Sequence, residues 1–366
     1  MVLRKLRLSN YRNYETVALQ FSEAVNLIYG DNAQGKTNLL EAIHVLTLTK
    51  SFRTANDKEL IRHQSDQCEI HGDFWEDSGV HHSLTLLCNV GQGKSILLNR
   101  KRPPSNSAVI GKFPVVHFSP ESHRITSGAP AERRRFIDIL LCQSSSSYLA
   151  DLQDYNRVLR QRNALLGRPE QLEVASLYSW DQALATAGCK IIAARFQFVK
   201  SYSNILQQAY TRITSSTLPF QMVYRSSLEL DQLTTETFLQ HLSNERRHEL
   251  RRKQTMIGPH RDDFGFELNG NDLRRFGSRG EHKSALLALK IAETEYLQEK
   301  NMTLPIVLID DLTSELDQRR SARALEFFQN YGQLFVTSIA PMALPQSREN
   351  ALFEVVGGKV SRVAVS

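Results

Sequence analysis

The chain of 366 residues is 41% hydrophobic with a mean hydropathy of −0.35, which is typical of a globular protein with one large or two smaller domains. Its longest aliphatic run, at 306–309, is too short for a membrane span, the charged N-terminal segment does not resemble a signal peptide, and four scattered cysteines without a CxxC spacing suit a reducing cytoplasm. The net charge of +6 permits a nucleic-acid partner without requiring one.

Residues 1–125 are predicted to be rich in strands. Alternating or short apolar runs predict strands at 2–9, 24–30, 68–76, 81–90 and 94–100. A single helix, predicted over 35–50, interrupts them directly after a loop that contains glycines. We interpret 1–125 as the first half of a larger α/β domain.

Residues 126–253 are predicted to be helical and to form a second lobe. Pro130 is a suitable first-turn residue for a helix over 131–141. Between 175 and 210, apolar residues recur at spacings of three and four and define one helix face. Such a face usually packs in a core, so it predicts structure rather than a ligand site.

Residues 254–366 return to α/β character and are interpreted as the second half of the first domain. The pattern predicts a strand near 254–257, a hairpin through "ELNGND", a helix over 281–299, strands at 305–309 and 334–338, and a closing hairpin around Gly357 and Gly358. The segment "GPHRDD" at 258–263 is predicted to be a turn that holds His260 and Arg261 against Asp262 and Asp263, a structural salt-bridge cluster rather than a catalytic one.

A phosphate-binding loop is indicated by "IYGDNAQGKTNLLEA" at 28–42, which contains G-x-x-x-x-G-K-T between a predicted strand and a predicted helix. Glycines let backbone N–H groups converge on phosphate oxygens at the helix N-terminus. Lys36 is predicted to reach the β- and γ-phosphates of ATP, and Thr37 to bind Mg²⁺. The predicted nucleotide-binding residues are Gly30, Asp31, Asn32, Ala33, Gln34, Gly35, Lys36, Thr37 and Asn38.

Two carboxylates follow the apolar run at 306–309. At the end of a buried strand, Asp310 is predicted to hold Mg²⁺ through water and Asp311 to polarise the attacking water. Two acids that cap the next helix are the structural alternative. That alternative explains one carboxylate but not the fully apolar strand before them.

Two further segments resemble the ABC-type ATPases, which sandwich each nucleotide between two protomers. "TSELD" at 313–317 resembles their D-loop, and Ser278 with Gly280 resembles the signature that would contact the γ-phosphate held by the opposite protomer. Ser278 and Gly280 are therefore added to the predicted nucleotide-binding residues, and Ser278 joins Lys36, Asp310 and Asp311 as a predicted catalytic residue. The arrangement favours an ATP-dependent homodimer that closes as a clamp.

Distinctive segments are spread over nearly the whole chain: "LRLSNYRNY", "GDNAQGKTNLLEAI", "KSFRT", "FSPESHRITSGAPAERRRFID", "IGPHRDDFGFELNG" and "IDDLTSELD". Together they resemble the RecF family, the bacterial DNA replication and repair ATPases related to SMC-type proteins. The resemblance implies an α/β fold: an ABC-type ATPase head, with a P-loop core and an antiparallel β lobe, plus a helical second lobe. It implies a DNA-binding, ATP-dependent dimer that acts with RecO and RecR at single-strand gaps, assists recombinase loading and replication restart, and supports the SOS response.

The signature departs from the usual family pattern, since it reads Ser278-Arg279-Gly280-Glu281-His282-Lys283. Glu281 places a carboxylate where the family usually has an amide. Asp311 stands where ABC transporters have Glu, and Ser338 where they have His, so we expect a slow, DNA-stimulated hydrolysis that serves as a switch. Arg12 and Arg53 lie in segments that are near the nucleotide in SMC-like heads, and a surface salt bridge is the equal alternative.

DNA contact is predicted from basic clusters, most of them in the helical lobe. They suit backbone contact to single-stranded or gapped DNA without sequence reading. The predicted DNA-binding residues are Arg134, Arg157, Arg160, Arg247 and Arg251. Two alternatives remain: an ABC-type ATPase subunit, and a P-loop phosphotransferase that does not act on DNA. The long insertion disfavours the first. The second would give the D-loop and the signature no function.

Overall fold

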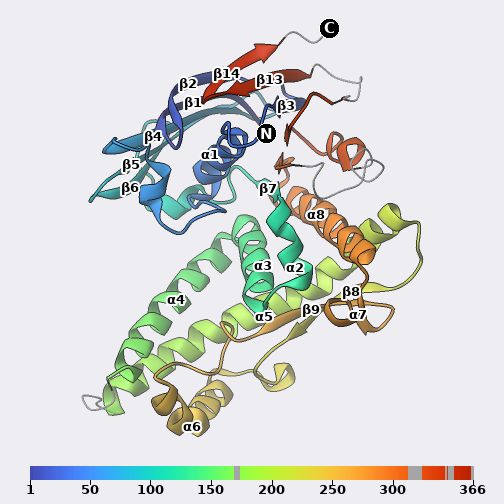
Figure 1. The fold of residues 1–366 in the computed structure, drawn as a ribbon. Helices are drawn as coiled ribbons and strands as arrows, with labels where there is room; N and C mark the ends of the chain where they lie inside the picture. Colours follow the sequence, from blue (N-terminus) through green and yellow to red (C-terminus); the bar gives the residue numbers. More distant parts are fainter. Residues whose placement is uncertain (169–173, 312–323, 343, 345–349, 364–366) are drawn as a thin grey trace. The chain divides into compact units, whose positions relative to one another are not determined.

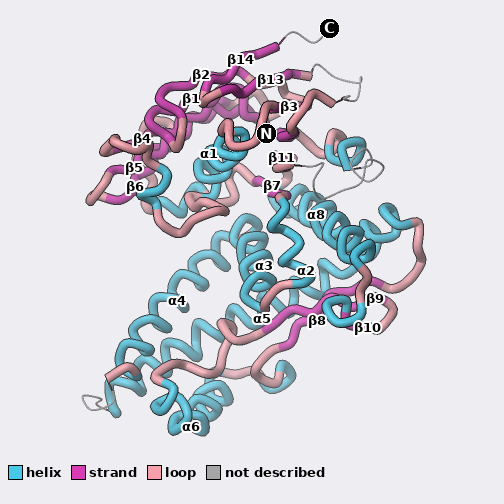
Figure 2. Tube along the Cα trace, in the orientation of Figure 1, coloured by secondary structure: helices cyan, strands magenta, loops and turns pink. Residues whose placement is uncertain are grey.

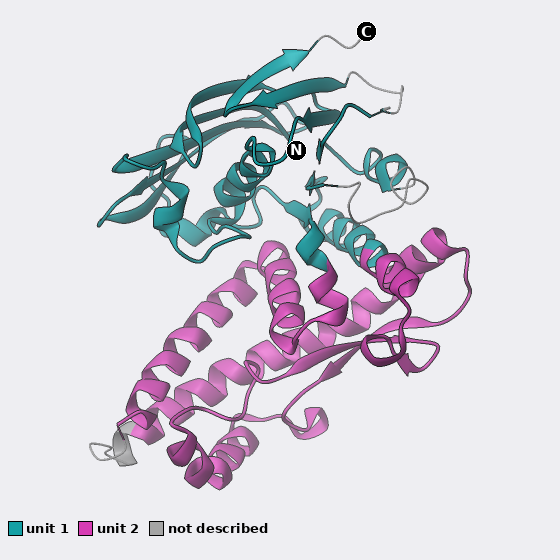
Figure 3. Cartoon of the chain, in the orientation of Figure 1, with its two compact units in different colours: residues 1–122, 287–366 teal, residues 123–286 magenta. Residues whose placement is uncertain are grey.

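The structure is a computed structural model that describes residues 1–168, 174–311, 324–342, 344 and 350–363. It divides into two compact units, residues 1–122 with 287–366 and residues 123–286, which are called unit 1 and unit 2 here (Figure 3). The "TSELD" segment lies outside the described residues. Among the helices that the structure describes, none is both long and apolar enough to span a membrane.

Unit 1 contains two sheets (Figure 1). The five-stranded sheet is antiparallel in the order β2-β1-β4-β5-β6, and the six-stranded sheet has the order β14-β13-β3-β12-β11-β7, parallel except for the β13–β14 pair. The strands are β1 (Val2–Tyr11), β2 (Tyr14–Gln20), β3 (Val25–Tyr29), β4 (Gln67–Trp75), β5 (His81–Asn89), β6 (Gly93–Leu98), β7 (Val115–Phe118), β11 (Ile306–Ile309), β12 (Leu334–Ser338), β13 (Ala351–Val356) and β14 (Lys359–Val363).

Helix α1 (Lys36–Leu48) packs on strands of both sheets, β4 and β5 of one and β7 and β12 of the other. Every side chain from Leu39 to Leu48 is buried, as expected for a helix that is covered on all sides. Gly72 of β4 permits this close packing, because a Cβ there would lie 2.6 Å from a methyl carbon of Leu46. The core of unit 1 therefore fixes the direction of α1 from its first residue.

Unit 2 is helical, with one small antiparallel sheet in the order β10-β9-β8 that packs on α3 and α5 (Figure 2). Helix α8 (Arg279–Asn301) begins in unit 2, and its residues from Leu287 belong to unit 1. The other elements are α2 (Arg124–Ser127), α3 (Pro130–Ser144), α4 (Ser146–Leu166), α5 (Val174–Thr214), β8 (Phe220–Arg225), α6 (Thr235–Arg252), β9 (Asp263–Leu268), β10 (Asn271–Asp272) and α7 (Leu273–Phe276).

The strand predicted near 254–257 was wrong, because this segment is irregular. Its backbone groups bond to side chains instead of to a neighbouring strand: the N–H groups of Thr255 and Met256 donate to Asn163 Oδ1 and Glu249 Oε1. The limits of unit 2 also differ from the expected 126–253, since β9 pairs with β8 and keeps residues up to Leu286 with the helical lobe.

Buried ion pairs order the interior of unit 2. The fully buried Arg162 donates to Asp181 at 2.7 Å and to Glu249 at 2.5 Å. Arg195 binds Asp138 and the Pro259 carbonyl oxygen. Because removing one partner of a buried pair leaves an uncompensated charge, these contacts restrict how the helices can pack.

Candidate functional site

A pocket of about 380 Å³ in unit 1 lies at the carboxyl ends of the parallel strands, where ligands of open α/β sheets bind. It brings together the two motifs that sequence reasoning singled out. Its lining residues are Asn32, Ala33, Gly35, Lys36, Thr37, Asn38, Arg53, Asp310, Asp311, Thr337, Ser338 and Ile339.

The loop between β3 and α1 needs glycine at two positions. Gly30 and Gly35 have φ values of 149° and 116°, in the region that disfavours side chains. A Cβ at Gly30 would lie 2.3 Å from the Val355 carbonyl oxygen, and one at Gly35 would lie 2.5 Å from the Asn13 side chain. The loop is therefore held close to its neighbours in a backbone shape that favours glycine at these two positions.

Lys36 begins α1 and folds back over this loop. Its Nζ donates to the carbonyl oxygens of Gly30 at 2.5 Å and Asp31 at 2.7 Å. Burial lowers the pKa of Lys36 below its ordinary value, and the carboxylates of Asp311 and Asp310 act in the opposite direction. The ammonium group thus lies where an anion in the loop could replace the two carbonyl acceptors.

Asp310 lies directly opposite the start of α1. Its Oδ1 accepts hydrogen bonds from Thr37 Oγ1 at 3.0 Å and from Thr337 Oγ1 at 2.7 Å. Burial raises the pKa of Asp310, while these two hydrogen bonds lower it and nearby Asp311 raises it further. Asp311 has a φ of 50°, and its N–H donates to Thr337. A hydroxyl and a carboxylate oxygen from distant segments are thereby held side by side at the pocket.

Arg12 and Arg53 converge on a buried carboxylate that the sequence did not single out. Glu41 of α1 is fully buried, and it accepts hydrogen bonds from Arg12 at 2.8 and 2.6 Å and from Ser51 at 2.5 Å. Arg53 Nη1 lies 3.9 Å from Glu41 and donates to Asn38 of the phosphate loop at 2.7 Å. The role of Glu41 is revealed only by contacts between segments that are distant in sequence. Its spacing on α1 would by itself predict a position in the core.

The signature residues Ser278 and Gly280 belong to unit 2, whereas unit 1 alone lines the pocket. Ser278 and Glu281 form reciprocal bonds: the Ser278 N–H donates to Glu281 Oε2 at 2.7 Å, and the Glu281 N–H donates to Ser278 Oγ at 3.3 Å. This capping box satisfies two N–H groups at the start of α8. Glu281 therefore has a local structural role that its charge alone did not suggest.

The basic clusters of unit 2 divide into buried and exposed arginines. Arg157 and Arg160 of α4 and Arg247 and Arg251 of α6 are exposed, and Arg157 pairs with Asp154. Arg134 is half-buried and donates to the Asp262 carbonyl oxygen at 2.6 Å. Arg134 is thus the predicted DNA-binding residue with the least freedom to reach a phosphate.

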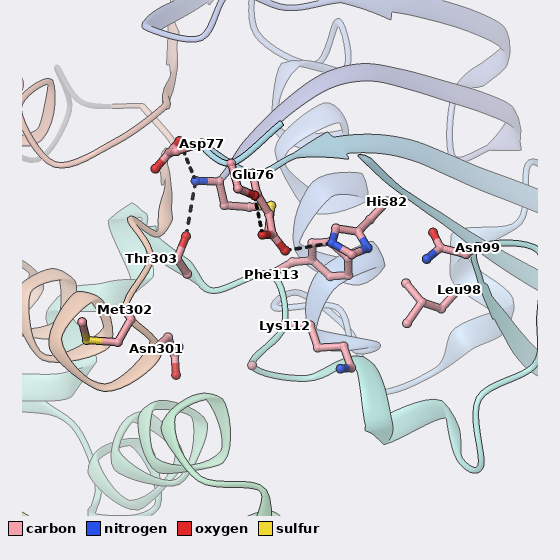
Figure 4. A pocket seen from close by; sticks show the side chains of 13 residues that line it. Glu76, Asp77, His82, Leu98, Asn99, Lys112, Phe113, Asn301, Met302 and Thr303 are labelled. Atoms are coloured by element: carbon pink, nitrogen blue, oxygen red, sulfur yellow. Dashed lines mark hydrogen bonds and ion pairs between the residues drawn. The ribbon is translucent and has the colours of Figure 1, made fainter. Parts of the chain in front are cut away.

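A second cavity of unit 1, of about 510 Å³, lies near the amino ends of β7 and β11. Figure 4 shows the side chains that line it. Phe113 and Thr303, which precede β7 and β11, help to line it. Its acids have partners: Glu76 pairs with His82 at 2.9 Å, and Asp77 with the terminal amine at 3.6 Å. Because it lies at the amino ends of the strands, it is separate from the nucleotide-type pocket.

Comparisons with known proteins match nearly the whole chain. The family model of the RecF/RecN/SMC N-terminal domain matches residues 2–361. The DNA replication and repair protein RecF of Lachnoclostridium phytofermentans is 36% identical over 99% of this chain and 100% of its own length. A solved structure of the recombination mediator protein RecF-ATP in the RecFOR pathway has a TM-score of 0.91 at 30% identity, covering 99% of this chain and 97% of that one. An SMC head bound to a winged-helix domain of ScpA, at 13% identity, a TM-score of 0.54 and coverages of 100% and 98%, shares the fold alone.

Proposed function

The chain belongs to the RecF family of DNA replication and repair proteins, and we propose that it is an ATP-dependent DNA-binding protein of recombinational repair. One observation carries this proposal: Lys36, Thr37, Asp310 and Asp311 line a single pocket although 273 residues separate Thr37 from Asp310. The solved structure of a RecF relative with ATP supports ATP as the nucleotide. The proposed site of action is the cytoplasm, where the DNA lies.

The residues present fit ATP and Mg²⁺. The glycine loop leaves no room for a Cβ, and Lys36 already offers its ammonium group to oxygen acceptors. Thr37 and Asp310 supply one hydroxyl and one carboxylate. Such a small number of protein ligands suits Mg²⁺, whose other ligands would be phosphate oxygens and water. Among the described residues, no group of three or more His, Cys, Asp or Glu side chains is arranged so that it could hold a metal ion, so a metal held by protein ligands alone is not favoured.

Hydrolysis is proposed to be slow, so that its rate sets how long the ATP-bound homodimer stays closed. Asp311 would orient the attacking water, and Lys36 would hold the terminal phosphates. Mg²⁺, when bound, would neutralise charge on the phosphates. Thr337 bonds both Asp310 and the Asp311 N–H, so it fixes the two acids relative to each other.

The pocket is proposed to be completed by a second copy of the chain. The residues of the signature, Ser278 and Gly280, start a helix whose N–H groups suit an anion, yet they belong to a different unit from the pocket. ATP would hold two copies together around DNA at a gap. RecO and RecR are the proposed partners, with recombinase loading, replication restart and SOS induction as the outcome.

The test is sedimentation velocity with ATP and Mg²⁺ on the intact protein and on Lys36→Met and Ser278→Arg. Each is run without DNA, with gapped duplex, and with an uninterrupted duplex of the same sequence as the control. Of the three proteins, only the intact one is expected to form a homodimer when ATP is present. Gapped duplex is expected to strengthen that dimer more than the uninterrupted duplex does. A protein that stays monomeric throughout while hydrolysing ATP would contradict the clamp and favour the phosphotransferase.

A further inference from the structure

Unit 2 contains a cavity of about 500 Å³ that is separate from the nucleotide-type pocket. The backbone of β9 and the segment around α7 form much of its lining. Four arginines and two aspartates lie along it, which gives a surplus of two positive charges (4 − 2). The charged lining residues are Arg133, Arg225, Arg274, Arg275, Asp263 and Asp272.

Two of the arginines neutralise the two aspartates. Arg133 is buried and binds Asp263 through two parallel hydrogen bonds, of 2.9 and 3.0 Å. Arg225 binds Asp272 at 3.0 Å and lies 3.5 Å from Glu267. These pairs build a fixed polar wall and leave no unbalanced acid inside the cavity.

The other two arginines supply the surplus charge. Arg274 and Arg275 of α7 are exposed, and no acidic side chain of the described part of the chain pairs with either. A guanidinium group offers a planar fork of donors that matches two phosphate oxygens. Two such groups side by side suit an oxyanion better than a halide, and a phosphate has enough oxygen atoms to accept from both at once.

The cavity offers no stacking surface inside. Phe264 and Phe266 of β9 line it but are 0% and 4% exposed, so neither ring is available to a base. Gly265 lies between them, and a Cβ there would lie 2.8 Å from the Arg225 guanidinium carbon. The wall is therefore backbone and guanidinium, which suits a phosphate and not a whole nucleotide.

We propose that this cavity receives a phosphate of a nucleic-acid strand, held by Arg274 and Arg275. The proposal adds a contact to those expected on α4 and α6, and it places that contact next to the signature. Neutralising a backbone phosphate at an exposed cavity mouth carries no base information, so recognition there is independent of sequence.

The position of the cavity also links DNA to the signature, and this part rests on the proposed function. Only Phe276 and Gly277 separate Arg275 from Ser278. The Gly277 N–H donates to the Leu273 carbonyl at 2.8 Å, and His282 of α8 bonds the cavity residue Thr126 at 2.9 Å. A phosphate that holds α7 in place would therefore hold the first turn of α8 as well.

The test compares three double variants that keep the buried pairs intact. Arg274→Gln with Arg275→Gln removes both guanidinium groups and their charges. Arg274→Lys with Arg275→Lys keeps the positive charges without the guanidinium groups. Lys359→Gln with Arg362→Gln removes two exposed charges from β14 and is the matched control. Binding to fluorescent gapped duplex is measured without nucleotide from about 50 to about 200 mM KCl, where phosphate contacts dominate the salt dependence.

The glutamine variant is expected to bind at least about tenfold more weakly, with a salt slope reduced by roughly 1, because one phosphate contact is lost. The lysine variant should keep most of the slope and lose part of the affinity, and the β14 control should change little. Equal behaviour of the glutamine variant and the control would overturn the proposal. So would unchanged DNA binding with the loss of a second bound ATP, because the cavity would then hold a free nucleotide.

The link to the signature is tested separately by ATP-driven association with and without DNA. DNA should strengthen association of the intact protein more than that of the glutamine variant, and equal strengthening overturns the link. If ATP drives no association in any variant while DNA binding still depends on the two arginines, the clamp fails and the phosphate site stands.

Discussion

Glu41 shows how one buried carboxylate organises two cations near the phosphate loop. Burial alone would raise its pKa, but hydrogen bonds from Arg12 and Ser51 hold the pKa of Glu41 below its ordinary value. The charged carboxylate then offsets Arg12 and Arg53, which would otherwise repel each other. Arg53 lines the pocket, so Glu41 is a positioning residue for a group that can face ATP.

Replacing Glu41 with Gln is expected to weaken both the fold and nucleotide binding. The change leaves the largely buried Arg12 without a counter-charge, which costs about 3 kcal/mol of unfolding free energy for a pair of this burial. Affinity for a fluorescent ATP analogue should fall about tenfold, while exposed Glu59→Gln changes neither quantity. Urea unfolding and equilibrium titration measure the two effects, and a Glu41→Gln variant with unaltered ATP affinity would contradict the positioning role.

His260 is held neutral by its surroundings. Its Nδ1 contacts Tyr155 Oη at 2.6 Å and its Nε2 the Thr255 carbonyl oxygen at 3.1 Å, so Nε2 carries the proton and Nδ1 accepts from the tyrosine. Burial lowers the pKa of His260 from 6.5 to about 4. The unfolded chain therefore binds a proton at a higher pH than the folded chain does.

Stability is accordingly expected to decrease as the pH falls from about 6.5 toward about 4, because the unfolded state takes up the proton first. The loss between about pH 7 and about pH 5 should be about 2 kcal/mol, and His260→Gln should lack this component. Urea unfolding of the intact protein, His260→Gln and exposed His241→Gln at both pH values measures it. An identical pH dependence in all three proteins would show that His260 is not the group responsible.

At the scale of elements, the first turn of α8 combines a cap with a candidate phosphate contact. Its Ser278 bonds lower the pKa of Glu281, so the residue is a carboxylate at neutral pH. The carboxylate suits the positive end of the helix in the free chain but opposes a γ-phosphate brought by a second copy.

Glu281→Gln should therefore strengthen ATP-driven association several-fold, since the amide still accepts the Ser278 N–H without the negative charge. Glu299→Gln, an exposed acid at the far end of the same helix, is the control. Sedimentation equilibrium in ATP and Mg²⁺ gives both dissociation constants. Weaker association of Glu281→Gln would mean that the carboxylate supports the clamp instead of limiting it.

At the scale of the whole molecule, sequence reasoning anticipated which segments meet wherever the backbone pattern itself requires it. The phosphate loop was predictable because a strand, two glycines and a helix are contiguous, and Asp310 because parallel strands end at one edge. The roles of Glu41 and of the arginine cavity depend on contacts between distant segments, which no spacing encodes. In "GPHRDD", the expected ion pairs among neighbours were wrong: Asp263 pairs with Arg133, and Asp262 accepts from Tyr224 and Ser227.

The proposed clamp also accounts for an exposed aromatic side chain. Phe276 is 72% exposed although it ends α7 just before the signature. Large apolar side chains exposed beside a functional loop commonly mark an interface, and a phenylalanine buried between two copies contributes substantially to affinity. Because Ser278 is proposed to face the ATP of the second copy, Phe276 is expected to become buried in the same contact.

Phe276→Ser should therefore raise the dissociation constant of the ATP-driven dimer at least about tenfold, with ATP binding by the single chain unchanged. Tyr178→Ser, which removes a 61% exposed aromatic from α5 of the same unit, is the matched control and should leave association intact. Sedimentation velocity over a range of protein concentrations, with parallel ATP titrations, separates the two effects. If both variants associate like the intact protein, the surface beside the signature is not the contact, and the clamp would have to close through another face.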